Sequence, residues 1–358
     1  MLVDTLTSQT FWGRGYTKDG MHKAADFLAA EMKSYGLKPM DGKKFLQPYS
    51  YSVNTFPDKM EVSINGKRLI PGKDFLVTAE SRGLTALGGL VQLDSVQFVN
   101  KESQLIVKLV DKLTWTARQK VTEYTTIEVD KKSLTSSPAS FDIDITNKFE
   151  KKFKASNVCG IVPGTQHPDS FFVISAHYDH LGGMGKDTYF PGANDNASGV
   201  SLLLNLAHYY ATHPQPYTMC FILFSGEEAG LLGSKYFTEH PLIPLDHIRF
   251  LINTDLAGTG IDGITVVNAS EFPKEFALMQ KINEDNHLLT AVNSRGKAAN
   301  SDHYFFTEKG VPSFFFYTLG GTTAYHDIND ISATLPMNEH EDLFRLVKVF
   351  FEEVDQDK

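Results

Sequence analysis

Cysteine is scarce in this sequence, and long apolar runs are missing from it. The 358 residues include two cysteines, Cys159 and Cys220, which are too few for a framework of disulfides. Both lie in apolar runs typical of strands, so we expect two buried thiols, with a disulfide between neighbouring strands as the alternative. No run approaches the ~18 apolar residues of a membrane helix, and we therefore predict no membrane span.

Positive charge is also in deficit. The sequence has 34 Lys and Arg against 43 Asp and Glu, a formal net charge of -9, which argues against nucleic acid or an anionic membrane as a partner. The start, Met1-Leu2-Val3-Asp4, lacks the charged segment and apolar stretch of a signal peptide. On these residues alone we expect a cytoplasmic protein, or one whose targeting segment has been removed.

The length suits one large domain, or a domain that carries a sizeable insertion. Residues 1–50 contain a helical pattern at 18–36, with one apolar stripe and a stop at Gly36. Residues 51–155 are short alternating stretches separated by turn residues, which predicts a β-rich insertion that shapes or covers a site. Residues 156–358 are expected to form, together with 1–50, the domain that carries the chemistry.

From about residue 157 the pattern alternates between apolar runs and helical segments. The apolar runs are 171–176, 219–224, 250–252 and 314–317, and helical spacing occurs around 200–207, 229–239 and 276–286. Runs that are apolar on both faces are typical of buried parallel strands. The alternation predicts an α/β fold, with a mixed, largely parallel central sheet flanked by helices.

Ligand-type side chains follow each of these apolar runs. Functional groups collect at the carboxyl ends of the strands in open α/β sheets, so we expect these residues to meet. A turn-rich loop between the first two runs adds one more carboxylate just before a helix. The candidate residues are His177, Asp179, Asp195, Glu227, Glu228, Asp255 and His326.

Imidazole and carboxylate are the ligands of zinc and of metals near it in hardness. Two histidines and three carboxylates can hold two ions when one carboxylate bridges them, and such a pair polarises a carbonyl and activates water. The adjacent Glu227 and Glu228 can divide the tasks of base and ligand. Asp179 can accept the second imidazole N–H of His177 and fix its tautomer.

Each piece has an ordinary structural alternative. His177-Tyr178-Asp179 can be a surface loop, the two glutamates can stabilise a helix N-terminus, and Asp195 or Asp255 can be a cap. What favours a metal site is that five such residues each follow a predicted strand or precede a helix. A serine hydrolase is disfavoured because no serine lies in a Gly-x-Ser-x-Gly elbow.

Several stretches occur together in a fixed order. They are Gly13-Arg14-Gly15, Gly36-Leu37-Lys38-Pro39, Ala176-His177-Tyr178-Asp179-His180-Leu181-Gly182, Gly192-Ala193-Asn194-Asp195-Asn196-Ala197-Ser198-Gly199, Ser225-Gly226-Glu227-Glu228-Ala229-Gly230-Leu231-Leu232-Gly233-Ser234, Asn253-Thr254-Asp255, Ser301-Asp302-His303 and His326. In these stretches the sequence resembles the M28 zinc peptidases, which are aminopeptidases and related carboxypeptidases. The resemblance covers residues 11–40 and 157–350, and the segment between them matches poorly.

The resemblance implies two Zn²⁺ ions and a role for each residue. Asp195 would bridge the ions, with His177 and Asp255 completing one site and Glu228 and His326 the other. Glu227 would be the general base and Asp179 would orient His177. Some members stabilise the oxyanion with a tyrosine shortly before Ser-Asp-His, but residues 297–300 here contain none. The role is then either unfilled or taken by another residue, with Tyr317 and His303 as the candidates.

The function that the resemblance implies is a zinc exopeptidase, an aminopeptidase acting on peptide substrates. Glutaminyl cyclisation and carboxypeptidase activity on the same fold are the alternatives, followed by a binding protein without catalysis. The resemblance also implies a periplasmic or secreted location, with the cytoplasm as the alternative. Residue patterns do not predict the oligomeric state, the terminal side chain preferred or the identity of the native metal.

Overall fold

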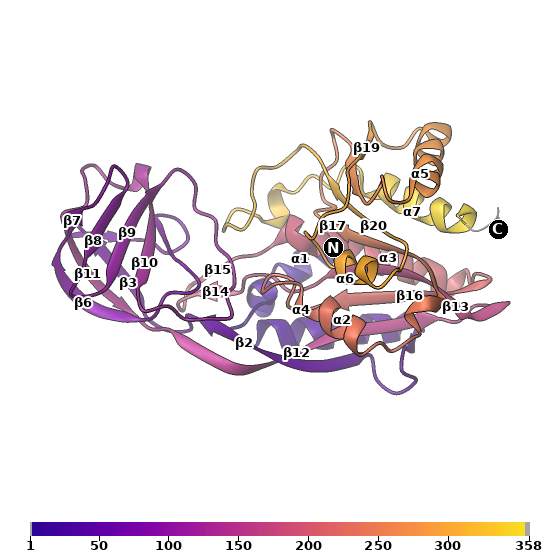
Figure 1. The fold of residues 1–358 in the computed structure, drawn as a ribbon, viewed down its shortest axis with the longest axis horizontal. Coiled ribbons are helices and arrows are strands. Elements are labelled where there is room, and N and C mark those ends of the chain that lie inside the picture. Colours follow the sequence, from indigo (N-terminus) through magenta and orange to yellow (C-terminus); the bar gives the residue numbers. More distant parts are fainter. Residues whose placement is uncertain (1, 355–358) are drawn as a thin grey trace.

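The computed structural model describes residues 2–354, and its centre is a nine-stranded mixed sheet (Figure 1). The strand order is β1-β12-β16-β13-β17-β20-β18-β19, and β2 pairs with β12 beside this path. The strands are β1 (Lys38–Pro39), β2 (Leu46–Thr55), β12 (Lys148–Val162), β13 (His167–His177), β16 (Tyr217–Phe224), β17 (Ile248–Asp255), β18 (Ile264–Val267), β19 (Val292–Ser294) and β20 (Ser313–Thr318).

Four strands at the centre of this sheet are parallel. β16, β13, β17 and β20 are neighbours in that order, while β12 and β18 flank them in the antiparallel direction. The predicted runs at 171–176, 219–224, 250–252 and 314–317 all lie within these four strands. The α/β fold with a largely parallel central sheet is therefore confirmed, and the carboxyl ends of the four strands meet at one edge.

Helices cover both faces of the sheet, which explains why the central strands are apolar on both sides. Phe172 and Ile174 of β13 join the core beneath α2, α3, α5 and α7, whereas Phe171 and Val173 join the core beneath α4 and α6. The helices are α1 (Leu2–Leu6), α2 (Gly20–Ser34), α3 (Gly199–Thr212), α4 (Leu232–Glu239), α5 (Pro273–Asn286), α6 (His303–Glu308) and α7 (His340–Glu353). Short helical turns are η1 (Gln9–Arg14), η2 (Lys131–Ser133), η3 (Ala193–Ser198), η4 (Leu245–His247) and η5 (Ser332–Thr334).

The helix expected from residue 229 begins three residues later, at Leu232. Leu231 has a positive φ of 58°, and the carbonyl of Glu227 accepts hydrogen bonds from the N–H groups of Gly230 and Leu231. This turn delays the helix, because a residue in the left-handed region does not continue a right-handed one. Glu227 and Glu228 consequently lie in a loop rather than at a helix N-terminus.

The segment between β2 and β12 forms two further sheets with a hydrophobic core of their own (Figure 1). Their orders are β5-β10-β9-β8-β7 and β4-β3-β11-β6. The strands are β3 (Met60–Ile64), β4 (Lys67–Leu69), β5 (Phe75–Val77), β6 (Leu84–Gly89), β7 (Val91–Gln92), β8 (Gln97–Asn100), β9 (Leu105–Val110), β10 (Thr125–Asp130) and β11 (Ser140–Ile145). A short antiparallel hairpin of β14 (Gly183–Met184) and β15 (Thr188–Tyr189) follows β13 in the sequence, outside the inserted segment.

β2 and β12 connect the inserted sheets to the central sheet. They pair from Leu46 and Val158 to Thr55 and Lys148, along the lower side of the molecule in Figure 1. Each is one continuous strand, so the borders proposed at 50/51 and 155/156 fall inside strands rather than in linkers.

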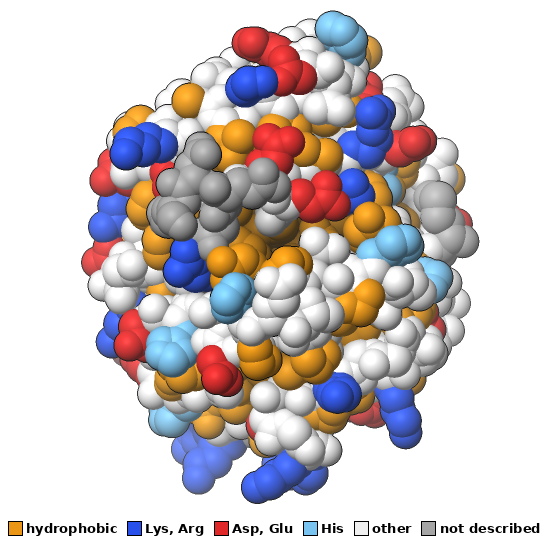
Figure 2. Space-filling model, turned by 90° about the vertical axis from the view of Figure 1, so that its right-hand side faces the viewer, with side chains coloured by type: hydrophobic (Ala, Val, Ile, Leu, Met, Phe, Trp, Pro, Cys, Tyr) orange, Lys and Arg blue, Asp and Glu red, His pale blue; other side chains and the backbone are white. Residues whose placement is uncertain are grey.

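Both cysteine side chains are buried and unpaired, Cys159 in β12 and Cys220 in β16. The alternative of a disulfide between neighbouring strands is therefore not what this structure shows. Among residues 2–354, no helix combines the length and the apolar character that crossing a bilayer requires. Figure 2 shows the end of the molecule opposite the inserted sheets, where acidic and basic side chains both occur among apolar ones.

Candidate metal centre

The structure brings the five predicted ligands together at the carboxyl edge of the parallel strands. His177 and Asp255 are the last residues of β13 and β17, and Asp195 lies in η3, between β15 and α3. Glu228 follows β16, and His326 lies in the loop after β20. These five residues are distant in sequence, so their meeting results from the parallel strand order.

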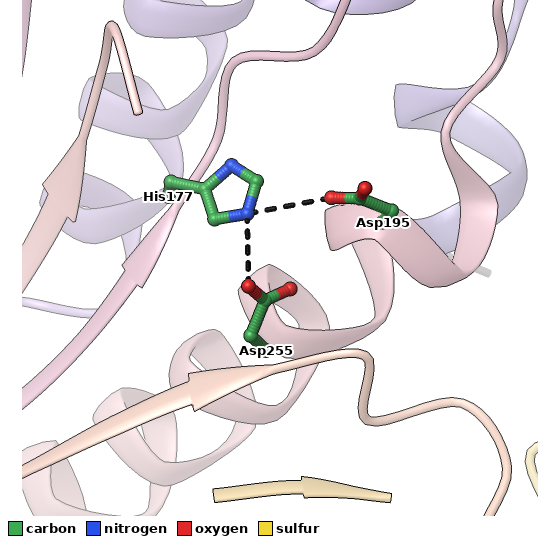
Figure 3. A group of neighbouring side chains, drawn as sticks. All are labelled: His177, Asp195 and Asp255. Atoms are coloured by element: carbon green, nitrogen blue, oxygen red, sulfur yellow. Dashed lines mark ion pairs between the residues drawn. The ribbon is translucent and has the colours of Figure 1, made fainter. Parts of the chain in front are cut away.

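One group consists of His177, Asp195 and Asp255, whose side chains point toward one another (Figure 3). His177 Nε2 lies 3.4 Å from Asp195 Oδ1 and 3.3 Å from Asp255 Oδ2. All three side chains are nearly or fully buried.

A second group shares Asp195 with the first. His326 Nε2 lies 3.0 Å from Asp195 Oδ2 and 3.2 Å from Glu228 Oε2. Asp195 thus turns one carboxylate oxygen toward each group. This is the geometry expected of a carboxylate that bridges two ions.

His180 belongs to the second group, although sequence reasoning gave it no role. Its Nδ1 lies 2.7 Å from Glu228 Oε1, and it can hold a metal together with Asp195 and Glu228. His180 and His326 therefore approach different oxygens of the Glu228 carboxylate. The signal in the sequence was a second histidine three residues after His177, within a motif already assigned to the site.

The donor atoms of both groups fit zinc. Two ligand atoms about 2.0–2.1 Å from a tetrahedral zinc lie about 3.3 Å apart, and the separations given above are 3.0–3.4 Å. Asp255 Oδ1 is also buried, and no group among residues 2–354 forms a hydrogen bond with it. Burial lowers the pKa of His326, but Glu228 and Asp195 reverse this and raise it to about 11. Carboxylates that favour a proton on imidazole so strongly also favour a metal cation in its place.

Asp179 is buried beside His177, but its contacts differ from the predicted one. His177 Nδ1 lies 3.1 Å from the backbone carbonyl of Asp179 and 3.8 Å from its carboxylate. The carboxylate instead accepts the N–H groups of Glu227 at 3.2 Å and Glu228 at 3.4 Å. Those two donors draw it away from the imidazole, so Asp179 positions both the histidine and the loop of the two glutamates.

The backbone around Asp195 is held by residues far along the chain. Asp330 accepts the N–H of Asn194 at 2.8 Å and that of Asp195 at 3.0 Å. The peptide bond from Asp195 to Asn196 is cis. Gly192 has a φ of 61°, and a Cβ there would lie 2.4 Å from the His180 ring. Only glycine fits at this position, because a side chain would displace His180.

Arg14 is a fully buried cation beneath this loop. Burial lowers its pKa to about 10, against the opposing effect of Asp195 and Asp330, so the guanidinium stays charged near neutral pH. Its three nitrogens donate to five backbone carbonyls at 2.7–3.4 Å, which are those of Leu6, Tyr178, Pro191, Gly192 and Asp195. The side chain therefore ties the N-terminal segment to the loops of His177 and Asp195.

Replacing Arg14 by Met is expected to lower the free energy of unfolding by about 3–5 kcal/mol, the usual cost of removing one partner from a buried charged network. The carbonyls would lose their donors while staying buried. The measurement is urea unfolding of the metal-free protein, so that metal loss does not contribute. Arg68→Met is the matched control, because Arg68 is exposed and its guanidinium pairs with the exposed Glu61 at 3.4 Å. Its effect should be within about 0.5 kcal/mol. Equal effects of the two variants would contradict this role of Arg14.

A cavity of about 300 Å³ opens above both groups. Glu227 lines it, and among residues 2–354 its carboxylate has no hydrogen-bond or ion-pair partner. Tyr325 lines it too, with its ring stacked on that of His326 at a centroid distance of 4.0 Å.

The two residues expected to stabilise an oxyanion, Tyr317 and His303, do not line the cavity. The Tyr317 hydroxyl accepts a hydrogen bond from Arg295, and His303 is buried against Phe315.

The inserted segment contributes directly to the site, through the chain between β9 and β10. The carbonyl of Trp115 lies 2.9 Å from His326 Nδ1, and the N–H of Trp115 donates to the carbonyl of His326 at 3.0 Å. The Trp115 indole is anchored in turn, since its N–H donates to the carbonyl of Val77 and its ring stacks on Phe190. This pair of contacts sets the orientation and tautomer of the His326 imidazole.

Comparison with known proteins agrees with this arrangement. A model of peptidase family M28 matches residues 157–350. A probable zinc metalloprotease from Pyricularia oryzae is 33% identical over 117 residues, 32% of this chain and 23% of the relative. Aminopeptidase YwaD from Bacillus subtilis is 31% identical over 175 residues, 45% of this chain and 35% of the relative. The chain thus spans about a third or less of the length of these two relatives.

The fold as a whole is similar to that of a zinc aminopeptidase from Bacillus subtilis. That structure superposes with a TM-score of 0.71 at 18% sequence identity, covering 98% of this chain and 94% of the other. At this identity the likeness concerns the fold alone. The family match, in contrast, spans more than half of the chain and contains the five predicted ligands and Glu227, and so the chain belongs to peptidase family M28.

Proposed function

We propose that this protein is a zinc-dependent exopeptidase, an aminopeptidase that removes N-terminal residues from peptides. The observation that carries the proposal is the pair of ligand groups that share Asp195 beneath a cavity lined by Glu227. Shared ligands favour two ions, which disfavours the cyclisation reaction with its single zinc. The names of relatives such as aminopeptidase YwaD also support it.

Each residue has a role in this proposal. His177, Asp195 and Asp255 hold one zinc, and Asp195, Glu228 and His326 hold the other. His180 fixes the Glu228 carboxylate through its contact with Oε1. Asp179 and Trp115 fix the two ligating imidazoles, His177 and His326 respectively.

When bound, the zinc ions supply Lewis acidity to the scissile carbonyl and to the attacking water. Glu227 accepts the proton of that water and returns it to the leaving amine, as a general base that becomes a general acid. Burial raises the pKa of Glu227, an effect that His177 opposes and the Glu228 carboxylate strengthens. The carboxyl can therefore hold the proton between the two transfers.

Tyr325 is the phenol placed to stabilise negative charge on the substrate oxygen. Burial and the carboxylates of Asp195 and Glu228 raise its pKa, so the hydroxyl keeps its proton near neutral pH. A neutral hydroxyl at the cavity wall is a hydrogen-bond donor suited to a developing oxyanion.

The test is hydrolysis of a panel of aminoacyl arylamides by the zinc-loaded protein, with a chelated sample as the control. We expect arylamine release that stops on chelation and returns when zinc is restored. The ranking of the panel would report the preferred terminal side chain. If two zinc ions are bound and no arylamide is cleaved, aminopeptidase activity is wrong and C-terminal trimming becomes the better hypothesis.

A further inference from the structure

One wall of the cavity comes from the inserted segment, at residues 116–118, and its position is fixed. Gln119 Nε2 donates to the carbonyl of Ala229 at 3.0 Å, beside the loop of Glu227 and Glu228. At the other end of the same chain segment, Lys112 Nζ donates to the carbonyl of Thr323 at 2.8 Å. Both ends of this segment are therefore bonded to the part of the protein that carries the metal ligands predicted above. Its two cavity-lining residues, Thr116 and Arg118, are held at a defined place, whereas Leu113, Trp115 and Ala117 are buried.

Arg118 is the side chain of interest on this wall. It lines the cavity and is exposed, and it is the only lysine or arginine among the residues that line it. In the described part of the chain, its guanidinium donates one hydrogen bond, to the carbonyl of the preceding residue, Ala117, at 3.1 Å. Within residues 2–354 no carboxylate forms an ion pair with it. A guanidinium offers five N–H donors in a planar fork, so most of its donors remain available.

Three of the four acidic residues that line the cavity are engaged elsewhere, and the fourth, Glu227, forms no ion pair with Arg118 within residues 2–354. Asp195, Glu228 and Asp255 are turned toward the histidines of the two groups. Their charge is offset by the ions of the proposed function. Arg118 is therefore the one lysine or arginine of the cavity lining that can meet an anionic group of the substrate.

The size of the cavity limits where that anionic group lies. About 300 Å³ is at the lower end of the usual range for ligand pockets. Such a space encloses only the part of a peptide next to the scissile bond. The planar fork of arginine matches a carboxylate in particular, with two parallel hydrogen bonds.

We propose that Arg118 is a specificity-determining residue that binds a carboxylate of the substrate close to the scissile bond. This carboxylate is the α-carboxylate of a short peptide or the side chain of an acidic residue. The inference rests on the proposed function, and it assigns to the inserted segment a direct part in substrate choice.

The test uses two pairs of substrates that differ only in one charge, with the terminal residue X that the arylamide panel favours. The first pair is the dipeptide X-Ala and its C-terminal amide, and the second is X-Asp amide and X-Asn amide. We expect the wild type to favour the charged member of at least one pair by about threefold to fivefold in kcat/KM, the upper range for one exposed ion pair. In Arg118→Gln that ratio should fall to about one.

Lys120→Gln is the matched control, because it removes the same charge two residues away, from an exposed side chain that does not line the cavity. It should keep the wild-type ratio. An effect confined to X-Ala identifies the α-carboxylate, and one confined to X-Asp amide identifies the acidic side chain.

The inference would be overturned by a wild type without preference in either pair, by Arg118→Gln with the ratio unchanged, or by an equal loss in Lys120→Gln. Failure of the proposed function has a different result. In that case the zinc-loaded wild type cleaves none of the four substrates, or cleaves N-acetylated X-Ala and not X-Ala.

Discussion

Replacing Glu227 by Gln is expected to lower kcat by about 10²–10⁴-fold, the usual contribution of a general base, and to leave the bound zinc unchanged. The reason lies in how the two adjacent glutamates are used. Glu228 contacts His180 and His326, whereas the carboxylate of Glu227 lines the cavity without such a partner in residues 2–354. Glutamine has nearly the same shape but cannot accept the proton of the attacking water.

The measurement is steady-state hydrolysis of the best arylamide, together with the zinc content of the same preparation. Glu228→Gln is the matched control, because it makes the same chemical change one residue along the chain. That variant should lose zinc, since the amide removes the charge of a ligand. Full activity of Glu227→Gln, or zinc loss equal to that of Glu228→Gln, would show that the roles of base and ligand are wrongly assigned.

The placement of His177 and Asp255 was predictable because it depends on strand order. A residue that directly follows a buried parallel strand must lie at the carboxyl edge, so His177 and Asp255 were fixed once the strands were recognised. The periodicity of residues 18–36 likewise predicted α2, with its buried stripe. These features depend on short stretches of sequence, so they could be recognised before the tertiary structure was known.

What could not be predicted are contacts between residues far apart in the chain. Arg14 reaches the carbonyl of Gly192, and Asp330 holds the N–H groups of Asn194 and Asp195. Arg14 belongs to a stretch that carries the resemblance, and Asp330 follows His326 by four residues, but no local pattern indicated which backbone groups either side chain would bind. The start of α4 was missed for a different reason, since Leu231 adopts a left-handed conformation that its residue type does not favour.

The insertion shows both sides of this limit. Its turn residues indicated short strands, and two sheets are present, but nothing in its sequence indicated that Trp115 would contact His326. That contact needs the insertion to fold back across the sheet edge, which no local pattern encodes. The domain borders and the periplasmic or secreted location stay predictions.

Removing the Asp195 side chain, as in Asp195→Ala, is expected to weaken both zinc sites at once. Its Oδ1 faces His177 Nε2 at 3.4 Å and its Oδ2 faces His326 Nε2 at 3.0 Å, so each group loses one oxygen ligand. Loss of an outer-shell partner already costs 10–100-fold in metal affinity, and loss of a shared ligand should cost each site more than about 100-fold. The backbone of Asp195 should stay in place, because Asp330 and Arg14 bind it independently of the side chain.

Asp255→Ala provides the comparison that tests bridging itself. Asp255 contacts only the first group, through His177 at 3.3 Å, so its loss should weaken one zinc site and leave the site of Glu228 and His326 close to wild type. The measurement is zinc titration of each variant by calorimetry, with the zinc retained after dialysis as a second readout. If Asp195 bridges, Asp195→Ala loses both ions where Asp255→Ala loses one. Equal losses in the two variants, or two ions retained by Asp195→Ala, would mean that the two sites do not share Asp195. The assignment of a bridging carboxylate would then be wrong.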